Sequence, residues 1–150
     1  MIDWIEVTAR IGAAAVIGGA IGINRHLHHK ATGVRTLSLV ASAAAALVLA
    51  TLHGQDGVLH VDAMSRVIQG ILTGLGFLGA GVIIRDRSTE RVHGLTTATA
   101  VWATAIIGVL CGIGAWRVTV ALACVVASVL LFGGLIERRW QAAFGGKQDQ

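Results

Sequence analysis

The sequence predicts an all-helical bundle of five membrane-spanning helices, with its N-terminus outside and its C-terminus in the cytoplasm. Long stretches without Asp, Glu, Lys or Arg recur along the 150 residues, and 55% of the residues are hydrophobic. The mean hydropathy of +0.74 is too high for a soluble domain of this length. A bilayer core takes about 20 mostly apolar residues per spanning helix, so five spans occupy most of the chain.

Each span is marked by its own apolar stretch. The first is uninterrupted from Ile11 to Asn24, and the acidic residues before it argue against a cleaved signal peptide. The second and third are free of charge over 36–55 and 67–84, and the last two are separated by Arg117. The predicted helices are 4–23, 36–53, 67–84, 95–113 and 117–136, in a single domain over 1–140 with a short cytoplasmic tail over 141–150.

Basic residues predict the orientation of the spans. Alternate connecting segments carry few and many Lys and Arg, so nine of the 12 fall on one side of the membrane and three on the other. Basic residues in short loops stay cytoplasmic, which places the C-terminus inside. The same dispersal of charge into loops explains the basic balance without a nucleic acid partner.

Several kinds of chemistry find no support in the sequence. Cys111 and Cys124 lie within predicted helices and form no metal-binding spacing. His26, His28 and His29 lack accompanying Cys or acidic residues, so we interpret them as a solvated basic loop. No nucleophile–base pattern, phosphate loop or redox motif is present, and we expect no catalytic residue, no cofactor, no metal and no enzyme.

Glycine is abundant, with 20 copies, and several pairs recur at a spacing of four residues. This spacing places both members on one helix face, where helices in a membrane approach each other closely. The predicted packing glycines are Gly18, Gly22, Gly70, Gly74, Gly76, Gly79, Gly81, Gly108 and Gly112.

Two groups of polar residues are candidate sites. The outer group is formed by ionisable and amide side chains at the beginnings of the first and third spans, and would be one polar or ion site if those helices adjoin. Its members are Glu6, Arg10, Asp62, Arg66 and Gln69. The inner group is a candidate cytoplasmic-face or partner site with Asn24, Arg25, Arg35, Thr36, Arg85, Thr96, Thr97 and Trp102. Loose pairing at the interface and helix capping are the simpler interpretations of these groups.

Two motifs at a fixed distance resemble the signature of the MgtC/SapB family of bacterial inner-membrane proteins. They are GLGFLGAGVI over 74–83 and VHGLTTATAVW over 92–102. Further matches include Glu6 with Arg10, the segment 33–36, and Asp62 with Arg66, so the resemblance extends from residue 6 to about residue 114.

The resemblance implies a multi-pass inner-membrane protein tied to growth at low magnesium and, in pathogens, to survival inside host cells. It implies either regulation of a membrane complex, such as a rotary ATP synthase or a cation pump, or magnesium transport. Two departures are evident: Asn24 stands where the family usually has an acidic residue, and the 14 residues after Ile136 predict a short form without the soluble C-terminal domain.

We therefore expect a membrane regulator of ion homeostasis that associates through its helices with itself or with another membrane protein. The alternative is a transporter or channel subunit for a cation such as Mg²⁺. A purely structural or lipid-organising role is the third possibility. The scarcity of acidic residues within the spans disfavours transport.

Overall fold

The computed structural model describes residues 3–27, 30, 32–52, 61–85 and 92–144. Five helices fill these ranges: α1 (Trp4–Leu27), α2 (Val34–Leu52), α3 (Val61–Val82), α4 (Leu95–Ile113) and α5 (Trp116–Phe144). Two short strands, β1 (Ile84–Arg85) and β2 (Val92–His93), pair antiparallel between α3 and α4. The prediction of an all-helical bundle with five candidate spans is confirmed, since all five helices are long and apolar enough to cross a membrane.

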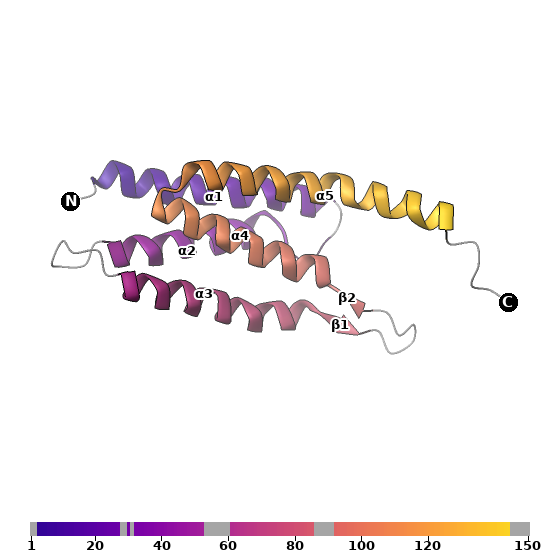
Figure 1. Ribbon diagram of the computed structural model, residues 1–150, viewed down its shortest axis with the longest axis horizontal. Coiled ribbons are helices and arrows are strands. Elements are labelled where there is room, and N and C mark those ends of the chain that lie inside the picture. The colour runs from indigo at the N-terminus through magenta and orange to yellow at the C-terminus, as the bar shows by residue number, and fades with distance from the viewer. Residues whose placement is uncertain (1–2, 28–29, 31, 53–60, 86–91, 145–150) are drawn as a thin grey trace.

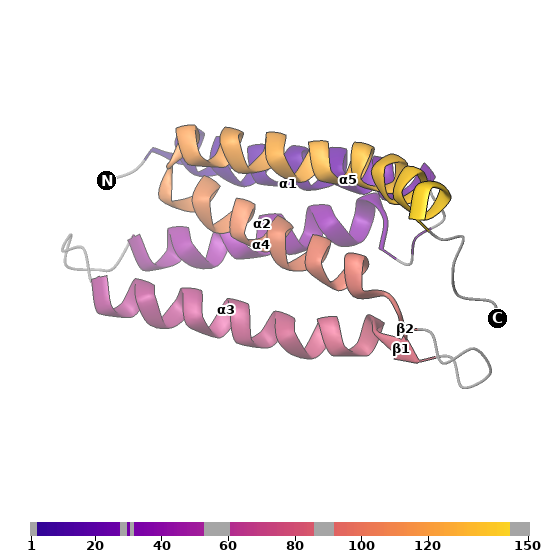
Figure 2. The same ribbon diagram turned by 45° about the vertical axis from the view of Figure 1, so that its right-hand side comes forward.

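Consecutive helices run in opposite directions along one elongated bundle (Figure 1). The beginnings of α1, α3 and α5 lie at one end of the bundle, which we call the α4–α5 end after the turn that joins these two helices. The strands and the connection from α1 to α2 lie at the opposite end, the hairpin end (Figures 1 and 2).

Helices α1, α3 and α5 each extend at one end well beyond the apolar stretch that predicted them, whereas α4 has the predicted bounds. Helix α1 ends at Leu27 rather than at residue 23, and α3 begins at Val61 rather than at residue 67. Helix α5 continues to Phe144, so it is about 43 Å long against a hydrocarbon core of about 30 Å. The apolar stretch records the thickness of the bilayer, whereas the backbone hydrogen bonds of a helix continue through the polar interface.

Helix α2 packs closely between α1 and α4 because glycines on both neighbours face its backbone. A Cβ atom added to Gly18 would lie 2.5 Å from the carbonyl oxygen of Leu37, and one added to Gly22 would lie 2.6 Å from the Cα of Val34. On the other side, a Cβ at Gly108 would collide with the carbonyl oxygen of Ala41. The core of the bundle, including Leu37, Ala41, Ala45, Ile107 and Cys111, surrounds these contacts.

Helix α4 is the central element, since it packs against each of the other four helices. Helices α3 and α5 lie at the margins, on opposite sides of the bundle (Figures 1 and 2). Only Leu75 and Gly79 of α3 are buried. Most of the surface of these two helices is therefore available to lipid or to another protein.

Both ends of α4 depend on a glycine with a positive φ angle. Gly94 precedes the helix with φ 94°, and a Cβ there would collide with the carbonyl oxygen of Val82. Gly114 follows the helix with φ 85°, and its N–H donates to the carbonyls of Leu110 and Cys111. This conformation is strained for residues with a Cβ, so glycine permits the tight turn into α5.

The contact between α2 and α4 predicts that Gly108→Ala destabilises the bundle. The added methyl group would have to displace the α2 backbone, which costs about 1–3 kcal/mol in a packed core. Thermal unfolding of the purified protein in detergent, followed by circular dichroism, should show a lower midpoint.

Gly12→Ala is the matched control, because nothing lies within 4 Å of a Cβ built at Gly12. Equal unfolding midpoints for the two variants would contradict the close contact between α2 and α4.

Candidate functional site

Arg10 of α1 connects two helices at the α4–α5 end. Its Nη1 donates to the carbonyl oxygen of Gly112 at 2.8 Å, and its Nη2 forms an ion pair with Glu6 one turn earlier. The negative end of the α4 dipole lies at this carbonyl, so the cation is favourably placed. The Arg10 side chain is 13% exposed, whereas the Glu6 side chain is 49% exposed. Arg10 is thus packed into the bundle, with Glu6 at its edge.

Arg25 makes the corresponding connection at the hairpin end. It is only 2% exposed. Its Nε donates to Thr32 Oγ1 at 3.3 Å, and its Nη2 donates to Thr97 Oγ1 in the first turn of α4. A buried charge requires such partners because burial removes its hydration. Arg25 is therefore committed to the interior of the protein and is not exposed to lipid headgroups.

The other members of the predicted inner group do not all converge on Arg25. Asn24 is half-buried, Thr96 is exposed, and Trp102 is 44% exposed although it lies within a span. Arg85 lies in β1, and its side chain is outside what the structure describes. Arg25 and Thr97 of this group are joined by a buried hydrogen bond.

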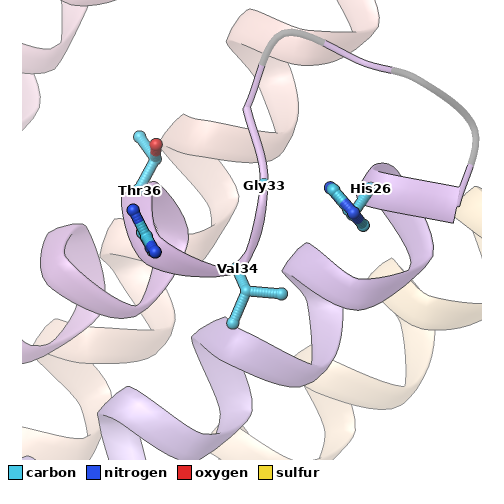
Figure 3. A pocket seen from close by; sticks show the side chains of 5 residues that line it. His26, Gly33, Val34 and Thr36 are labelled. Atoms are coloured by element: carbon cyan, nitrogen blue, oxygen red, sulfur yellow. The ribbon is translucent and has the colours of Figure 1, made fainter.

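Arg35 and Thr36 line a pocket of about 510 Å³ beside the beginning of α2. His26, Gly33 and Val34 complete its lining. Figure 3 shows His26 on the last turn of α1, facing the extended segment that carries Gly33 into α2. His28 and His29, which accompany His26 in the sequence, lie outside the described residues.

The structure does not bring the two halves of the predicted outer site together. Glu6 and Arg10 belong to α1, which packs against α2, α4 and α5. Asp62, Arg66 and Gln69 belong to α3, which packs against α2 and α4 on the other side of the bundle (Figures 1 and 2). A single ion site built from both helices is therefore not formed within this chain.

The polar residues at the beginning of α3 face outward. Asp62, Arg66 and Gln69 are all exposed, and Asp62 lies in the first turn of the helix. None of the three makes a side-chain hydrogen bond or ion pair with the part of the chain that the structure describes. Over the same described ranges, no group of three or more His, Cys, Asp and Glu side chains is placed to hold a metal ion.

The predicted packing glycines separate into two classes. Gly18, Gly22, Gly108 and Gly112 face α2 at distances too short for a Cβ, and Gly79 makes an ordinary contact with Ala98. The others are open, with nothing within 4 Å of an added Cβ, and all lie on α3: Gly70, Gly74, Gly76 and Gly81. The four-residue spacing in the sequence identified the glycines of both classes. It could not tell which of them face another helix of the bundle and which face outward.

Sequence reasoning missed two residues that complete the arginine contacts. Thr32 accepts a hydrogen bond from Arg25, and Gly114 leaves space for the Arg10 guanidinium, which would lie 2.9 Å from a Cβ at that position. A glycine directly after an apolar helix is a recognised sign of a helix end, so Gly114 was accessible from sequence. The role of Thr32 could not be inferred from the sequence, because no local pattern indicates its hydrogen bond with Arg25, seven residues earlier.

Five candidate spans, with an arginine of α1 hydrogen-bonded at each end of the central helix α4, define a multi-pass helical membrane protein. The sequence pattern of the MgtC family matches residues 11–139, and the chain belongs to that family.

Individual relatives agree with this assignment. The chain is 37% identical to Protein SrpB of Synechococcus elongatus over 77% of its own length and 68% of that protein. It is 38% identical to Protein MgtC of Salmonella typhimurium over 79% of its length, and 39% identical to Protein MgtC of Brucella abortus over 73%. The chain spans 49% and 43% of these two MgtC proteins, respectively. No solved structure matches the chain.

The buried contact at the hairpin end predicts that Thr97→Val destabilises the protein. The substitution preserves shape but removes the acceptor of Arg25 Nη2, and an unsatisfied buried donor costs about 1–3 kcal/mol. Thermal unfolding in detergent should show the loss. Thr96→Val is the matched control, since Thr96 is exposed and its unfolding midpoint should stay near that of the parent.

The α4–α5 end predicts unequal effects for the two members of its ion pair. Arg10→Gln loses a charged hydrogen bond to the Gly112 carbonyl, a bond that contributes about 1.5–3 kcal/mol. Glu6→Gln should change stability by less than about 1 kcal/mol, because half-exposed ion pairs are screened. Denaturation of both variants in detergent tests this order, and a larger loss for Glu6→Gln would contradict it.

Proposed function

We propose that this protein is a regulator in the bacterial inner membrane that contributes to magnesium homeostasis by lateral association of its helices. The observation that carries the proposal is the outward face of α3, where polar and small residues are exposed together with the large apolar Val61, Phe77 and Leu78. The link to magnesium comes from the resemblance to the MgtC/SapB family, and membership of the MgtC family supports it.

The proposed orientation has the α4–α5 end outside and the hairpin end in the cytoplasm. Nine of the 12 Lys and Arg residues lie in the first and third connecting segments and in the segment after the last span. These are the segments that the sequence predicts to be cytoplasmic. The alternating direction of the five helices is compatible with this arrangement (Figure 1). The positive-inside tendency then supports a cytoplasmic C-terminus.

Comparison of the two marginal helices supports a protein partner for α3. The exposed side chains of α5 are mainly large and apolar, as expected for contact with acyl chains: Val118, Val120, Val125, Val129, Leu131 and Phe132. The outward face of α3 instead includes Arg66, Gln69 and Thr73. Polar side chains within a span face protein or a watery cavity in preference to lipid.

The open glycines of α3 add a second reason. Gly70, Gly74, Gly76 and Gly81 serve no close contact within the described chain, although glycine weakens a helix by about 1 kcal/mol relative to alanine. In a membrane, small residues allow another helix to approach the backbone. We propose that the partner is a second copy or another membrane protein, with an ATP synthase or a cation pump as candidates from the family resemblance, and that no catalysis or cofactor is involved.

Transport of a cation is the second candidate function. The ionisable Glu6–Arg10 pair near the beginning of a span favours it, because such pairs accompany ion pathways. The separation of this pair from the polar residues of α3 argues against it, since each group alone offers a single carboxylate to a cation that prefers several oxygen ligands.

The proposal predicts that Gly70→Leu abolishes growth at low magnesium without reducing the amount of folded protein in the membrane. The new side chain enters open space within one chain but blocks the approach of a partner helix. Growth of the host bacterium carrying the variant in place of its own gene measures the effect.

Gly134→Leu on α5 is the control, because Gly134 is equally open and that helix face is apolar. Normal growth of the Gly70→Leu strain would contradict lateral association through α3. Flux of Mg²⁺ into liposomes containing the purified protein should equal that of empty liposomes, and saturable flux would favour transport instead.

A further inference from the structure

Six outward positions of α3 have the spacing of a coiled-coil seam. The intervals between them are four, three, four, three and four residues, and all six are exposed. We call this set the α3 seam: Asp62, Arg66, Gln69, Thr73, Gly76 and Ala80. No seam position carries a large apolar side chain, although the helix is otherwise apolar enough to cross a membrane.

The α3 seam lies away from the side of the helix that packs into the bundle. At 100° per residue, the inward residues Ile68, Ile71, Leu75 and Gly79 share one face, and the seam is centred about 135° around the helix from that face. The seam residues are exposed, and α3 itself lies at one margin of the bundle (Figure 2).

The depth of the polar seam residues makes contact with lipid unfavourable. At 1.5 Å per residue, Gln69 lies about 12 Å from the start of α3 and Thr73 about 18 Å, near the middle of the helix. Neither side chain, nor Asp62 or Arg66, has a hydrogen bond or ion pair within the described ranges. Polar groups in a bilayer core are costly until they find such partners.

We infer that the α3 seam binds the α3 seam of a second copy of this chain, an inference that rests on the proposed function. Two copies inserted in the same orientation are related by a two-fold axis along the membrane normal, so identical residues meet at the same depth. The alternating three- and four-residue intervals give two parallel helices with a left-handed crossing.

Each polar group of the α3 seam then has a partner of matching chemistry. Asp62 of one copy lies one turn from Arg66 of the other, which allows two reciprocal ion pairs between the parallel helices. The Gln69 amide is both donor and acceptor, so two copies bond to each other, and the Thr73 hydroxyl has the same property. Gly76 and Ala80 allow the second half of the helices to approach closely.

This complementarity selects a second copy over a different protein. The seam carries one positive and one negative charge, so it has no excess charge for an oppositely charged partner to neutralise. Asp62 and Arg66 pair across an offset of one turn, and the Gln69 amide and the Thr73 hydroxyl each both donate and accept at their own depth. An unrelated helix would have to reproduce the same order of groups at the same intervals.

Disulfide cross-linking in native membranes tests the contact. In a Cys124→Ser background, which removes the exposed thiol and keeps buried Cys111, Thr73→Cys should form a dimer on mild oxidation. Leu78→Cys is the control, because Leu78 is 54% exposed but lies about 140° around the helix. Gly76→Cys provides a second seam position if Thr73→Cys reduces the amount of folded protein.

A charge exchange tests the pairing itself. Asp62→Arg and Arg66→Asp should each weaken self-association about tenfold, because each creates repulsion across the two-fold axis. The two variants mixed together should form heterodimers at least as well as the parent, since both ion pairs are then restored. Energy transfer between labelled copies in liposomes measures all three combinations.

Equal cross-linking at Thr73→Cys and Leu78→Cys, or no cross-linking at either seam position, overturns the inference. If Gly70→Leu abolishes low-magnesium growth in that case, the proposed function stands with a different protein as the partner. If the seam cross-links but Gly70→Leu grows normally, the dimer stands and the proposed function through α3 fails.

Discussion

The close approach of α2 to its two neighbours is the constraint on which the rest of the bundle depends. Membrane helices are not driven together by exclusion of water, so they associate through close packing and hydrogen bonds. Glycines on α1 and α4 supply the space for both neighbours to approach α2, and Ser38 of α2 donates to the Ala15 carbonyl of α1 at 2.9 Å. The fixed distance between α1 and α4 follows from this arrangement.

That distance allows α1 to hold both ends of α4. Arg10 reaches the Gly112 carbonyl at one end, and Arg25 reaches Thr97 at the other. Burial of a cation without hydrogen-bonding partners is costly. Both contacts form together only when α1 and α4 have matching lengths and the right register. Because α4 packs against every other helix, fixing its ends also fixes the turn into α5 at Gly114 and the connection from β2 at Gly94.

The sequence was sufficient for the number of candidate spans, because a span is a property of a single segment. It was insufficient for which segments adjoin. The outer group required α1 and α3 to be neighbours, but α2 and α4 lie between them. Gly18 and Gly70 have equivalent four-residue spacing in the sequence, yet one faces a backbone and the other faces open space. The burial of Arg25 could not be predicted from the sequence either, because its hydrogen-bond acceptor Thr97 is 72 residues away along the chain.

The contrast between α3 and α5 follows from treating the membrane as a solvent. In water, an exposed helix face with charged, amide and hydroxyl groups is ordinary, and an apolar one suggests a partner. In lipid the expectation is reversed, because polar groups lose hydration and acyl chains offer no hydrogen bonds. The largely apolar exposed surface of α5 suits lipid, whereas the polar residues on the outward face of α3 have no hydrogen-bonding partner within the described ranges. The closest helix packing lies among α1, α2 and α4, so the proposed association through α3 leaves these contacts in place.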